Sequence, residues 1–480
     1  MSEERPLMLP AEIIRFLDGP GGHSLIIRGN AGTGKTTFTL QLAEEFKDRQ
    51  EAHYLSTRVS DGALLNQFPW LKDRLLKRTE VDIACQSRSG LGKLKGIHTG
   101  EIITPRREMT ISIGRTMPDV ERIYEVVEGS KERRMVIVDS IDALADRYDL
   151  NNRELMIALQ RDLVESKGAN IVLVLESNDY MLDYLGDGVV EFTRREHDRR
   201  LIREMDLMKL RGCEIQQPLY IYSLKGGRFQ CFGADWDAVK NDIKKGWNVT
   251  NGLQGRISYG IEDLDLMTGG MTPGEVVLFE FGQGMPTIVG DLLERSLVSN
   301  FANSGRGVIW VPLRKTSGST AKNVLHDMIP DDVLDRTVRV IEPASQMDSE
   351  GGRFVLPVEG SNVINDLKWK NLAFSLDGAA GPFLSLIGMD TLESIYGGDV
   401  MEGLVEHLAA IRKNGGVFVG MTTPTSRSTA RLADMATVHI KAERIGGTVV
   451  FYGSKPFTEC YALRLEHRAK GGCGTLTPLV

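Results

Sequence analysis

The chain has 480 residues, with 58 basic and 65 acidic side chains, a net charge of −7 and 41% apolar residues. This balance is typical of a globular protein with room for two or more domains. The acidic total argues against a protein held on nucleic acid by charge alone, because such binding grows with the phosphates that Lys and Arg neutralise. The longest apolar run, at residues 171–175, is far shorter than the roughly 20 residues of a membrane-spanning helix. We therefore expect no transmembrane helix.

The N-terminal sequence and the cysteines indicate the compartment. The first ten residues, MSEERPLMLP, are acidic and lack the apolar centre of a secretory signal. The cysteines are scattered without a Cys-x-x-Cys pair, which suits a reducing compartment and predicts neither disulfides nor a zinc site. We expect a cytoplasmic protein whose cysteines are small buried hydrophobic residues: Cys85, Cys213, Cys231, Cys460 and Cys473.

Two parts of the sequence repeat one pattern. Residues 24–28 (SLIIR) predict a short apolar strand, which a glycine-rich turn and an amphipathic helix at about residues 35–46 follow. Residues 275–279 (EVVLF) predict a second such strand, followed by FGQGMPT and another helix. Self-similarity of this kind indicates an internal repeat.

Spacing strengthens the case for a duplication. RRMVIVDSIDAL predicts a strand that ends at Asp139, and FLSLIGMDTLESI predicts one that ends at Asp390. Asp139 and Asp390 are 251 residues apart, as are Thr36 and Thr287. We therefore expect Asp390 to be the counterpart of Asp139.

The boundary between the two copies is expected near residues 240–255, where KKGWNVTNGLQGR is polar and contains glycine. In each half, short β-rich runs alternate with helical stretches, a pattern typical of a mostly parallel sheet covered on both faces. The sequence therefore predicts an α/β fold with two tandem domains, at residues 1–245 and 246–480.

The first glycine-rich turn matches a phosphate-binding motif. Residues 29–36 read GNAGTGKT and satisfy G-x-x-x-x-G-K-[ST] between a predicted strand and a predicted helix. Glycines let backbone N–H groups close around phosphate oxygens, Lys35 reaches the β- and γ-phosphates, and the Thr36 hydroxyl binds Mg²⁺. The alternative is a glycine turn beside an unrelated buried strand. We expect ATP to contact Gly29, Asn30, Ala31, Gly32, Thr33, Gly34, Lys35, Thr36 and Thr37.

The apolar run MVIVD supplies the second element of a nucleotide site. It ends in Asp139, which the sheet would place beside the loop, so we expect Thr36 and Asp139 to hold Mg²⁺. We assign Lys35 and Asp139 catalytic roles in any hydrolysis.

These motifs, with the run RRLIREMDLMKLRG, resemble the KaiC and RadA branch of RecA-type P-loop ATPases, whose core closes with Lys-x-Arg-Gly. Lys209, Arg211 and Gly212 stand at that signature. The resemblance implies RecA-like domains, a ring or dimer of subunits with nucleotide between neighbours, and catalytic Lys209 and Arg211 that reach the neighbour's γ-phosphate. The alternation of the same run also fits an exposed edge strand with outward charges.

One departure from that family affects hydrolysis. The family carries Glu after the strand that follows the Walker A helix, whereas this chain has Ser56, Thr57 and Arg58 there. A general base typically contributes about 10²–10⁴-fold to a rate, so hydrolysis should be slow or depend on another acid, such as Asp61 or Glu176. Glu176 also fits a helix cap or a surface carboxylate. A slow site suits a switch better than a motor.

The second copy lacks the phosphate motif. Pro286 occupies the position of Lys35, and Met285 replaces the preceding glycine. Proline offers neither a cation nor a backbone N–H. Lys455 persists near the closing motif, although Pro456 and Phe457 follow it. We expect a degenerate domain that binds no nucleotide and serves as a platform; a divergent pocket for another ligand is the alternative.

The segment from Arg194 to Arg211 carries seven basic and four acidic side chains in an acidic protein. Such a segment fits a solvated strand pair or a network of charges at a subunit interface. It also fits a surface that binds an acidic protein partner or DNA. A second basic stretch, at residues 88–107, is rich in glycine and predicts a mobile surface loop for contact. The candidate partner-binding residues are Arg194, Arg195, Arg199, Arg200 and Arg203.

The whole chain also resembles the GvpD family of archaeal gas-vesicle regulatory proteins. The likeness rests on the single intact Walker A motif, the arginine segment ahead of KLRG, the run CEIQQPLYIYSLKGGRF and the degenerate second half. It implies a repressor that binds a transcriptional activator and lowers its abundance, with the state of the nucleotide at Lys35 and Thr36 controlling that contact.

The rival hypothesis is a DNA-dependent recombination or repair ATPase of the RadA class. Only 28 residues precede Gly29, which leaves no N-terminal helix-hairpin-helix module, and the net charge is negative. Nucleic acid is therefore a possible but not a favoured partner, and we expect no membrane partner. A clock-type phosphorylation machine would need two working nucleotide sites.

Overall fold

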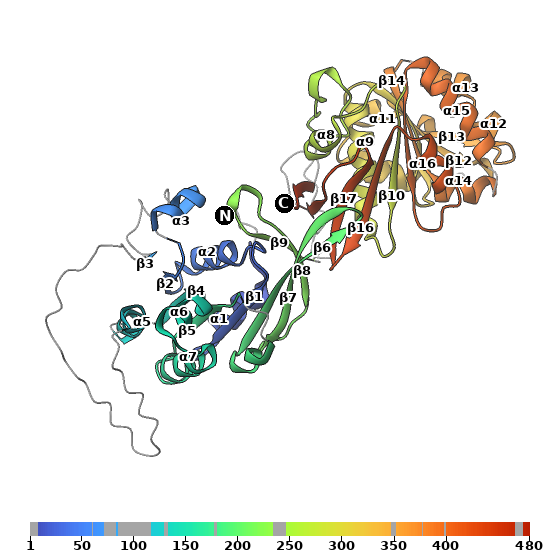
Figure 1. The fold of residues 1–480 in the computed structure, drawn as a ribbon. Coiled ribbons are helices and arrows are strands. Elements are labelled where there is room, and N and C mark those ends of the chain that lie inside the picture. Colours follow the sequence, from blue (N-terminus) through green and yellow to red (C-terminus); the bar gives the residue numbers. More distant parts are fainter. Residues whose placement is uncertain are drawn as a thin grey trace. The chain divides into compact units, whose positions relative to one another are not determined.

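The computed structural model describes residues 8–59, 61–71, 83–84, 117–128, 133–176, 180–233, 246–346, 352–376, 378–397, 400–465 and 474–480. The chain forms two compact units (Figure 1): Met1–Arg195 with Arg203–Cys231, and Glu196–Ile202 with Phe232–Val480. The predicted boundary at residue 245 stays a prediction, because residues 234–245 lie outside the described ranges.

A mostly parallel sheet forms the centre of the first unit, in the order β3-β2-β4-β5-β1-β6-β7-β8-β9. The central strand β1 (Ser24–Gly29) pairs in parallel with β5 and with β6, whereas β7 and β8 pair antiparallel. The other strands are β2 (Glu51–Ser56), β3 (Ile83–Ala84), β4 (Arg134–Asp139), β5 (Asn170–Val174), β6 (Gly188–His197), β7 (Arg200–Leu210), β8 (Leu219–Ser223) and β9 (Gln230–Phe232).

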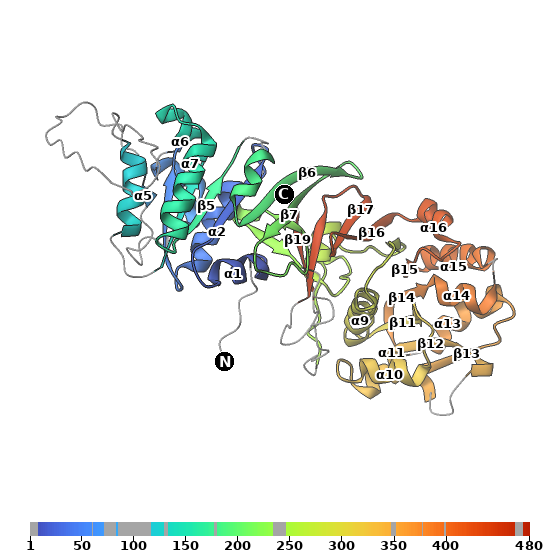
Figure 2. The ribbon, with the colours of Figure 1, turned by 90° about the horizontal axis from the view of Figure 1, so that it is seen from below.

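Helices cover both faces of this sheet, as the continuous apolar strands predict. Leu25 and Ile27 pack with α1 and α2 in one core, and Ile26 packs with α5, α6 and α7 in the other. Figure 2 shows these helices around the sheet. The helical elements are α1 (Ala11–Asp18), α2 (Lys35–Phe46), α3 (Asp61–Gln67), α5 (Pro118–Glu128), α6 (Ile141–Tyr148), α7 (Asn152–Leu159) with the π-helix η1 (Gln160–Glu165), and the 3-10 helices η2 (Tyr180–Leu185) and η3 (Lys225–Gly227).

The sheet of the second unit repeats this topology in the order β13-β12-β11-β14-β15-β10-β16-β17-β18-β19. Its strand β10 (Val276–Phe281) lies between β15 and β16, just as β1 lies between β5 and β6. The order matches strand for strand, and β13 adds one edge strand. The others are β11 (Arg306–Val311), β12 (Val338–Pro343), β13 (Val355–Val358), β14 (Ala380–Gly388), β15 (Val417–Thr422), β16 (Val438–Ile445), β17 (Thr448–Lys455), β18 (Tyr461–Leu465) and β19 (Gly474–Pro478).

Two helical layers also cover the second sheet. Val277 and Phe279 pack in the core that contains α8, α9, α10 and α11, while Val276 and Leu278 face the core that contains α12 to α16. The helical elements are η4 (Leu253–Gly255), α8 (Glu262–Thr268), α9 (Thr287–Asn303), α10 (Gly318–His326), α11 (Asp331–Thr337), η5 (Ala344–Gln346), η6 (Gly352–Phe354), α12 (Val363–Asp366), α13 (Trp369–Ser375), α14 (Met389–Tyr396), α15 (Met401–Asn414) and α16 (Thr429–Met435).

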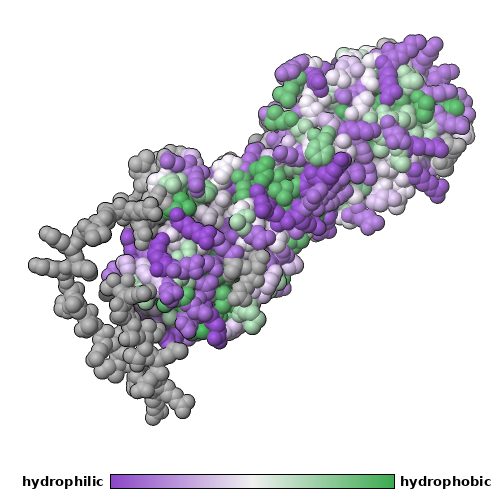
Figure 3. All heavy atoms as spheres, in the orientation of Figure 1, coloured by the Kyte–Doolittle hydropathy of each residue, from purple (hydrophilic) through white to green (hydrophobic). Residues whose placement is uncertain are grey.

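The predicted fold class is confirmed: the chain consists of two tandem RecA-like α/β domains with mostly parallel sheets. In the part of the chain that the structure describes, no helix has the length and apolarity to cross a membrane. Hydrophilic residues cover much of the face in Figure 3, and hydrophobic residues lie between them in small groups.

Candidate nucleotide site

The turn between β1 and α2 has the backbone of a phosphate-binding loop. Gly29, Gly32 and Gly34 have φ values of 143°, 76° and 94°, which side chains disfavour. A Cβ on Gly29 would lie 2.3 Å from the carbonyl oxygen of Phe192, and one on Gly34 would lie 2.8 Å from Leu224. The loop therefore needs glycine at these positions, and α2 offers its free N–H groups to an anion.

Lys35 is held inside this loop. Its amine donates to the carbonyl oxygens of Gly29 at 2.5 Å and Asn30 at 3.1 Å, and the residue is 7% exposed. Burial lowers the pKa of Lys35, and the carboxylates of Glu176 and Asp139 act in the opposite direction. A buried cation that only carbonyl oxygens satisfy is well suited to an incoming phosphate, so the residues present fit a nucleotide.

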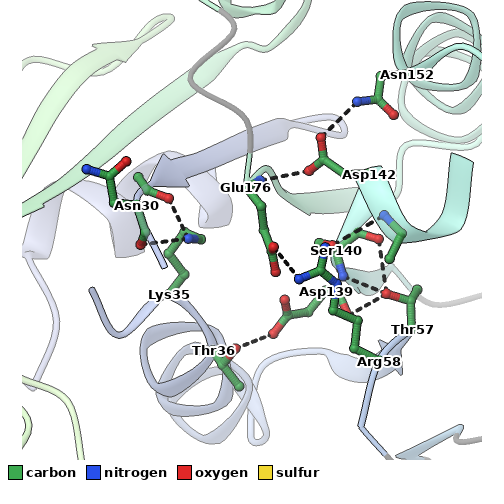
Figure 4. Close-up of polar contacts among 12 residues, drawn as sticks. Asn30, Lys35, Thr36, Thr57, Arg58, Asp139, Ser140, Asp142, Asn152 and Glu176 are labelled. Atoms are coloured by element: carbon green, nitrogen blue, oxygen red, sulfur yellow. Dashed lines mark hydrogen bonds and ion pairs between the residues drawn. The ribbon is translucent and has the colours of Figure 1, made fainter. Parts of the chain in front are cut away.

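The two predicted magnesium ligands lie together. The Thr36 hydroxyl donates to Oδ2 of Asp139 at 2.6 Å (Figure 4). The Tyr54 hydroxyl donates to the same oxygen, also at 2.6 Å. Burial and the Asp139 carboxylate raise the pKa of Tyr54 well above its ordinary value, so the phenol stays a donor. The hydroxyl and the carboxylate are the oxygen donors that Mg²⁺ uses beside nucleotide phosphates.

Thr57 joins the end of β2 to the end of β4. Its N–H donates to the carbonyl oxygen of Asp139 at 2.9 Å, and its hydroxyl accepts from the N–H of Ser140 at 2.8 Å. Arg147 donates to the Thr57 carbonyl oxygen at 2.6 Å. These bonds fix the backbone that presents Arg58 at the position where the KaiC and RadA branch carries an acid.

Arg58 forms an ion pair with Glu176 (Figure 4). Glu176 follows β5, and its N–H donates to Oδ2 of Asp142 at 2.7 Å. The side chain of Asp61, the other candidate acid, lies outside the described part of the chain. Of the two acids that the sequence offered as a general base, Glu176 is the one whose side chain the structure describes. Its carboxylate is paired with the Arg58 guanidinium.

Lys209 and Arg211 lie near the start of β1, whereas the phosphate-binding loop of the same chain follows the end of β1. The N–H of Arg211 donates to the carbonyl oxygen of Asp187 at 2.9 Å, and the Asp187 carboxylate accepts from Ser24, the first residue of β1. The loop follows the last residue of β1, roughly 17 Å away at about 3.3 Å per residue. This placement excludes a role in cis and leaves the expected role in trans open.

Two arginines of the segment contact the loop itself. Arg194 donates to the carbonyl oxygen of Ala31 at 3.3 Å, and Arg203 donates to that of Gly32 at 2.9 Å. Tyr222, on β8, donates to the carbonyl oxygen of Thr33. These contacts were not predictable from the sequence, because they depend on the hairpin of β6 and β7 folding over the loop.

Arg200 differs from its neighbours. Residues 196–202, the tip of this hairpin, belong to the second unit, where Arg200 is 6% exposed. Its guanidinium donates to the carbonyl oxygens of Gly453 and Thr458, each at 2.6 Å, and lies over the ring of Tyr452. The expectation that Arg200 binds a partner is corrected, because these internal contacts occupy its side chain.

The other candidate residues fall into three groups. Arg195 is exposed and pairs with Glu204 at 2.5 Å, and Arg199 is also exposed. Thr37 is buried in α2. The basic stretch at residues 88–107 lies outside the described ranges.

The corresponding loop of the second unit offers no cation. Thr287 begins α9 as Lys35 begins α2, so Pro286 takes the place of Gly34, and the exposed Gln283 and Gly284 occupy the turn. The expected match of Pro286 with Lys35 is therefore wrong by one residue. Glu280 stands at the position of Arg28, the residue before Gly29, and accepts from His439 at 2.8 Å. A loop without a lysine at the start of its helix offers phosphate no side-chain cation there, as expected for a degenerate site.

The expected equivalence of Asp139 and Asp390 is wrong. Through β5, Asp139 lies in register with Ile27, the fourth residue of β1, on the face that α2 covers. The fourth residue of β10 is Phe279, on the face that α9 covers, and it leads through Met421 of β15 to Gly388. Gly388, the last residue of β14, is therefore the counterpart of Asp139.

Asp390 corresponds instead to Asp142, since each is the second residue of the following helix, α14 or α6. Asp390 accepts from Thr423 at 2.7 Å, Thr425 at 2.6 Å and Ser426 at 2.9 Å. It organises the loop after β15, and the described residues of the second unit include no lysine at the position of Lys35 and no aspartate at the position of Asp139.

The sheet order, the loop before α2 and the pair of Thr36 and Asp139 define a P-loop protein of the KaiC and RecA class. Residues 13–208 match the family described as GvpD gas vesicle protein, P-loop domain. The whole chain is 25% identical to Protein GvpD2 of Halobacterium salinarum over 508 aligned positions, covering 100% of this chain and 98% of the relative. The chain is thus a KaiC/RecA-like P-loop protein that resembles GvpD, as the sequence predicted.

Three further proteins are similar to this chain. Protein GvpD1 of the same organism is 24% identical over 552 positions, with 99% and 97% of the two chains covered. Circadian clock oscillator protein KaiC of Parathermosynechococcus lividus is 23% identical over 297 positions, 58% of this chain and 50% of its own. A solved KaiC-like protein from Pyrococcus horikoshii OT3 is 18% identical with a TM-score of 0.34, covering 44% of this chain and 90% of its own.

Proposed function

We propose that this protein is an ATP-dependent regulatory switch of gas-vesicle gene expression that uses Mg²⁺ and contacts a transcriptional activator through its arginine segment. The resemblance to GvpD supports the regulatory role. The single observation that carries the mechanism is the pair of bonds from Arg194 and Arg203 to the carbonyl oxygens of the phosphate-binding loop.

These bonds couple two binding events. Nucleotide phosphates would use the N–H side of the loop, while the two arginines use its carbonyl side. Phosphate would replace the carbonyl oxygens that now hold Lys35, so the loop that the arginines contact would change its polar partners. An acidic surface of the partner would compete for the same guanidinium groups. The proposed partner surface consists of Arg194, Arg195, Arg199 and Arg203.

Hydrolysis would be slow and would need a second subunit. Arg58 stands where the related ATPases carry an acid, and Glu176 is paired with it. Lys209 and Arg211 would act on the nucleotide of a neighbouring subunit in a homo-oligomer, because they lie far from their own loop. In this proposal ATP binding controls contact, and turnover resets the switch slowly in the cytoplasm.

The test is capture of the purified activator of the gas-vesicle genes by the full chain, with ATP and Mg²⁺, with ADP, or without nucleotide. We expect capture to depend on the nucleotide and to be lost in Arg194→Glu with Arg203→Glu. Arg161→Glu is the matched control, since Arg161 is an exposed arginine of the same unit. Nucleotide-independent capture, or equal capture by the double variant, would refute the switch.

The alternative function is a DNA-dependent recombination or repair ATPase of the RadA class. An ATPase assay with and without single-stranded DNA distinguishes it from the regulatory switch. That class requires strong stimulation by single-stranded DNA. We expect no such stimulation; a large increase in rate together with no capture would favour the alternative.

A further inference from the structure

Arg58 combines a main chain that hydrogen bonds hold in place with an exposed side chain that pairs with Glu176. It follows Thr57, whose bonds to Asp139, Ser140 and Arg147 fix the main chain at the end of β2. Its side chain is 51% exposed. The Arg58 guanidinium can therefore exchange one ionic partner for another by rotation of its side chain, while the main chain stays in place.

Its present partner, Glu176, lies beside the start of the phosphate-binding loop. The N–H of Leu175 donates to the carbonyl oxygen of Ile27 at 2.8 Å, two residues before Gly29. Asp142 holds the N–H of Glu176, and the Glu176 side chain is 30% exposed. Figure 4 shows the Glu176 carboxylate directed at Arg58, in the space that Lys35 and Asp139 also border.

The charges in this space depend on one another. Lys35, Glu176 and Arg58 surround one space in Figure 4, and Glu176 pairs with Arg58 there. A terminal phosphate held by Lys35 would lie close to both side chains. A phosphate there would repel Glu176 and attract Arg58.

We propose that Arg58 is a specificity-determining residue that exchanges Glu176 for the terminal phosphate of a nucleoside triphosphate bound to its own subunit. A nucleoside diphosphate lacks the third phosphate, so Arg58 would stay paired with Glu176. The pair would thereby report the presence of the third phosphate from within one chain, separately from any contact that Lys209 and Arg211 make in a neighbour. The proposal rests on the proposed nucleotide site.

The experiment is titration of the full chain with fluorescent analogues of ATP and ADP in the presence of Mg²⁺. We expect Arg58→Ala to weaken triphosphate binding about tenfold, the order expected for one lost hydrogen bond to a charged group, and to leave diphosphate binding unchanged. Glu176→Gln should strengthen triphosphate binding, because the competing carboxylate is removed. Arg161→Ala, another exposed paired arginine of this unit, should change neither affinity.

Unchanged triphosphate binding in Arg58→Ala, or an equal loss for both nucleotides, would overturn the role of Arg58 while leaving the nucleotide site intact. Failure of the unaltered chain to bind either nucleotide would overturn the site itself and this proposal with it.

Discussion

The hydroxyl of Thr36 and the carboxylate of Asp139 are 2.6 Å apart, which joins the first turn of α2 to the end of β4. The two residues come from distant parts of the chain, and each is a ligand type that Mg²⁺ accepts. Tyr54 donates to the same carboxylate oxygen from β2, so three elements orient it.

Asp139→Asn should remove most of the dependence of nucleotide binding on Mg²⁺. Loss of even an outer partner of a metal ligand costs about 10–100-fold in affinity, and loss of the ligand itself should cost at least as much. Titration of a fluorescent nucleotide with Mg²⁺ and with EDTA measures the effect. Tyr54→Phe, which removes only the hydroxyl donor, should have a smaller effect; an Asp139→Asn variant that responds to Mg²⁺ as before would exclude this metal site.

Arg211→Ala should impair assembly without impairing nucleotide binding to its own loop. Arg211 lies near the start of β1, at the end of the sheet opposite the loop. Its side chain is 67% exposed and forms an ion pair with Asp187 at 3.0 Å. One hydrogen bond to a charged group contributes about 1.5–3 kcal/mol, so the concentration for half-assembly should rise about tenfold or more. Mass measurement with and without ATP gives this value. Assembly equal to that of Arg161→Ala would remove the proposed role in trans.

Arg200→Ala should destabilise the second unit. The substitution removes two hydrogen bonds from the buried guanidinium, to the carbonyl oxygens of Gly453 and Thr458, at a cost of about 2 kcal/mol. The Gly453 oxygen still accepts from the N–H of Thr458. Arg199→Ala is the matched control, since Arg199 is exposed. Urea unfolding of both variants compares them directly, and equal stability of the two would contradict the buried arrangement of Arg200.

Glu294 should make the stability of the second unit depend on pH. Burial in α9 raises its pKa from 4.5 to about 7, despite hydrogen bonds from Trp310 and Leu313. The folded state therefore holds a proton that the unfolded state releases at lower pH. This contribution to stability is complete below pH 4.5 and is lost as the pH rises to about 7, by about 3 kcal/mol.

Glu294→Gln should remove this dependence, because glutamine keeps an acceptor for both donors and does not ionise. Thermal unfolding between pH 5 and pH 7 measures the difference between the slopes of the two proteins. A slope in Glu294→Gln as steep as that of the unaltered chain would show that another group titrates.

The α/β fold with mostly parallel sheets and the nucleotide loop were predictable from local patterns. Apolar runs separated by helical periodicity define parallel strands, and the glycines near Lys35 have a narrow chemical purpose. Both patterns lie within a few dozen residues of sequence. They can therefore be recognised without knowing which distant residues are in contact.

The error at Asp390 has a physical cause. Two spacings of 251 residues coincided, yet the pairing of β14 with β15 shows that the counterpart of Asp139 is Gly388. The shared pattern of SIDAL and GMDTL carries the correct alignment, since both place an aspartate second in a helix. Spacing alone misleads when insertions and deletions compensate.

The different roles of Arg200 and its neighbours were not predictable. A run of arginines looks uniform in sequence, whereas the hairpin of β6 and β7 directs Arg194 and Arg203 to the loop and buries Arg200. Only the three-dimensional course of the hairpin separates them.

The most direct test of the asymmetry between the two units is the number of nucleotides bound per chain, measured by calorimetric titration with ATP and Mg²⁺. The account predicts one nucleotide per chain in the unaltered protein and none in Lys35→Ala. Two nucleotides per chain, or one that remains in Lys35→Ala, would contradict it.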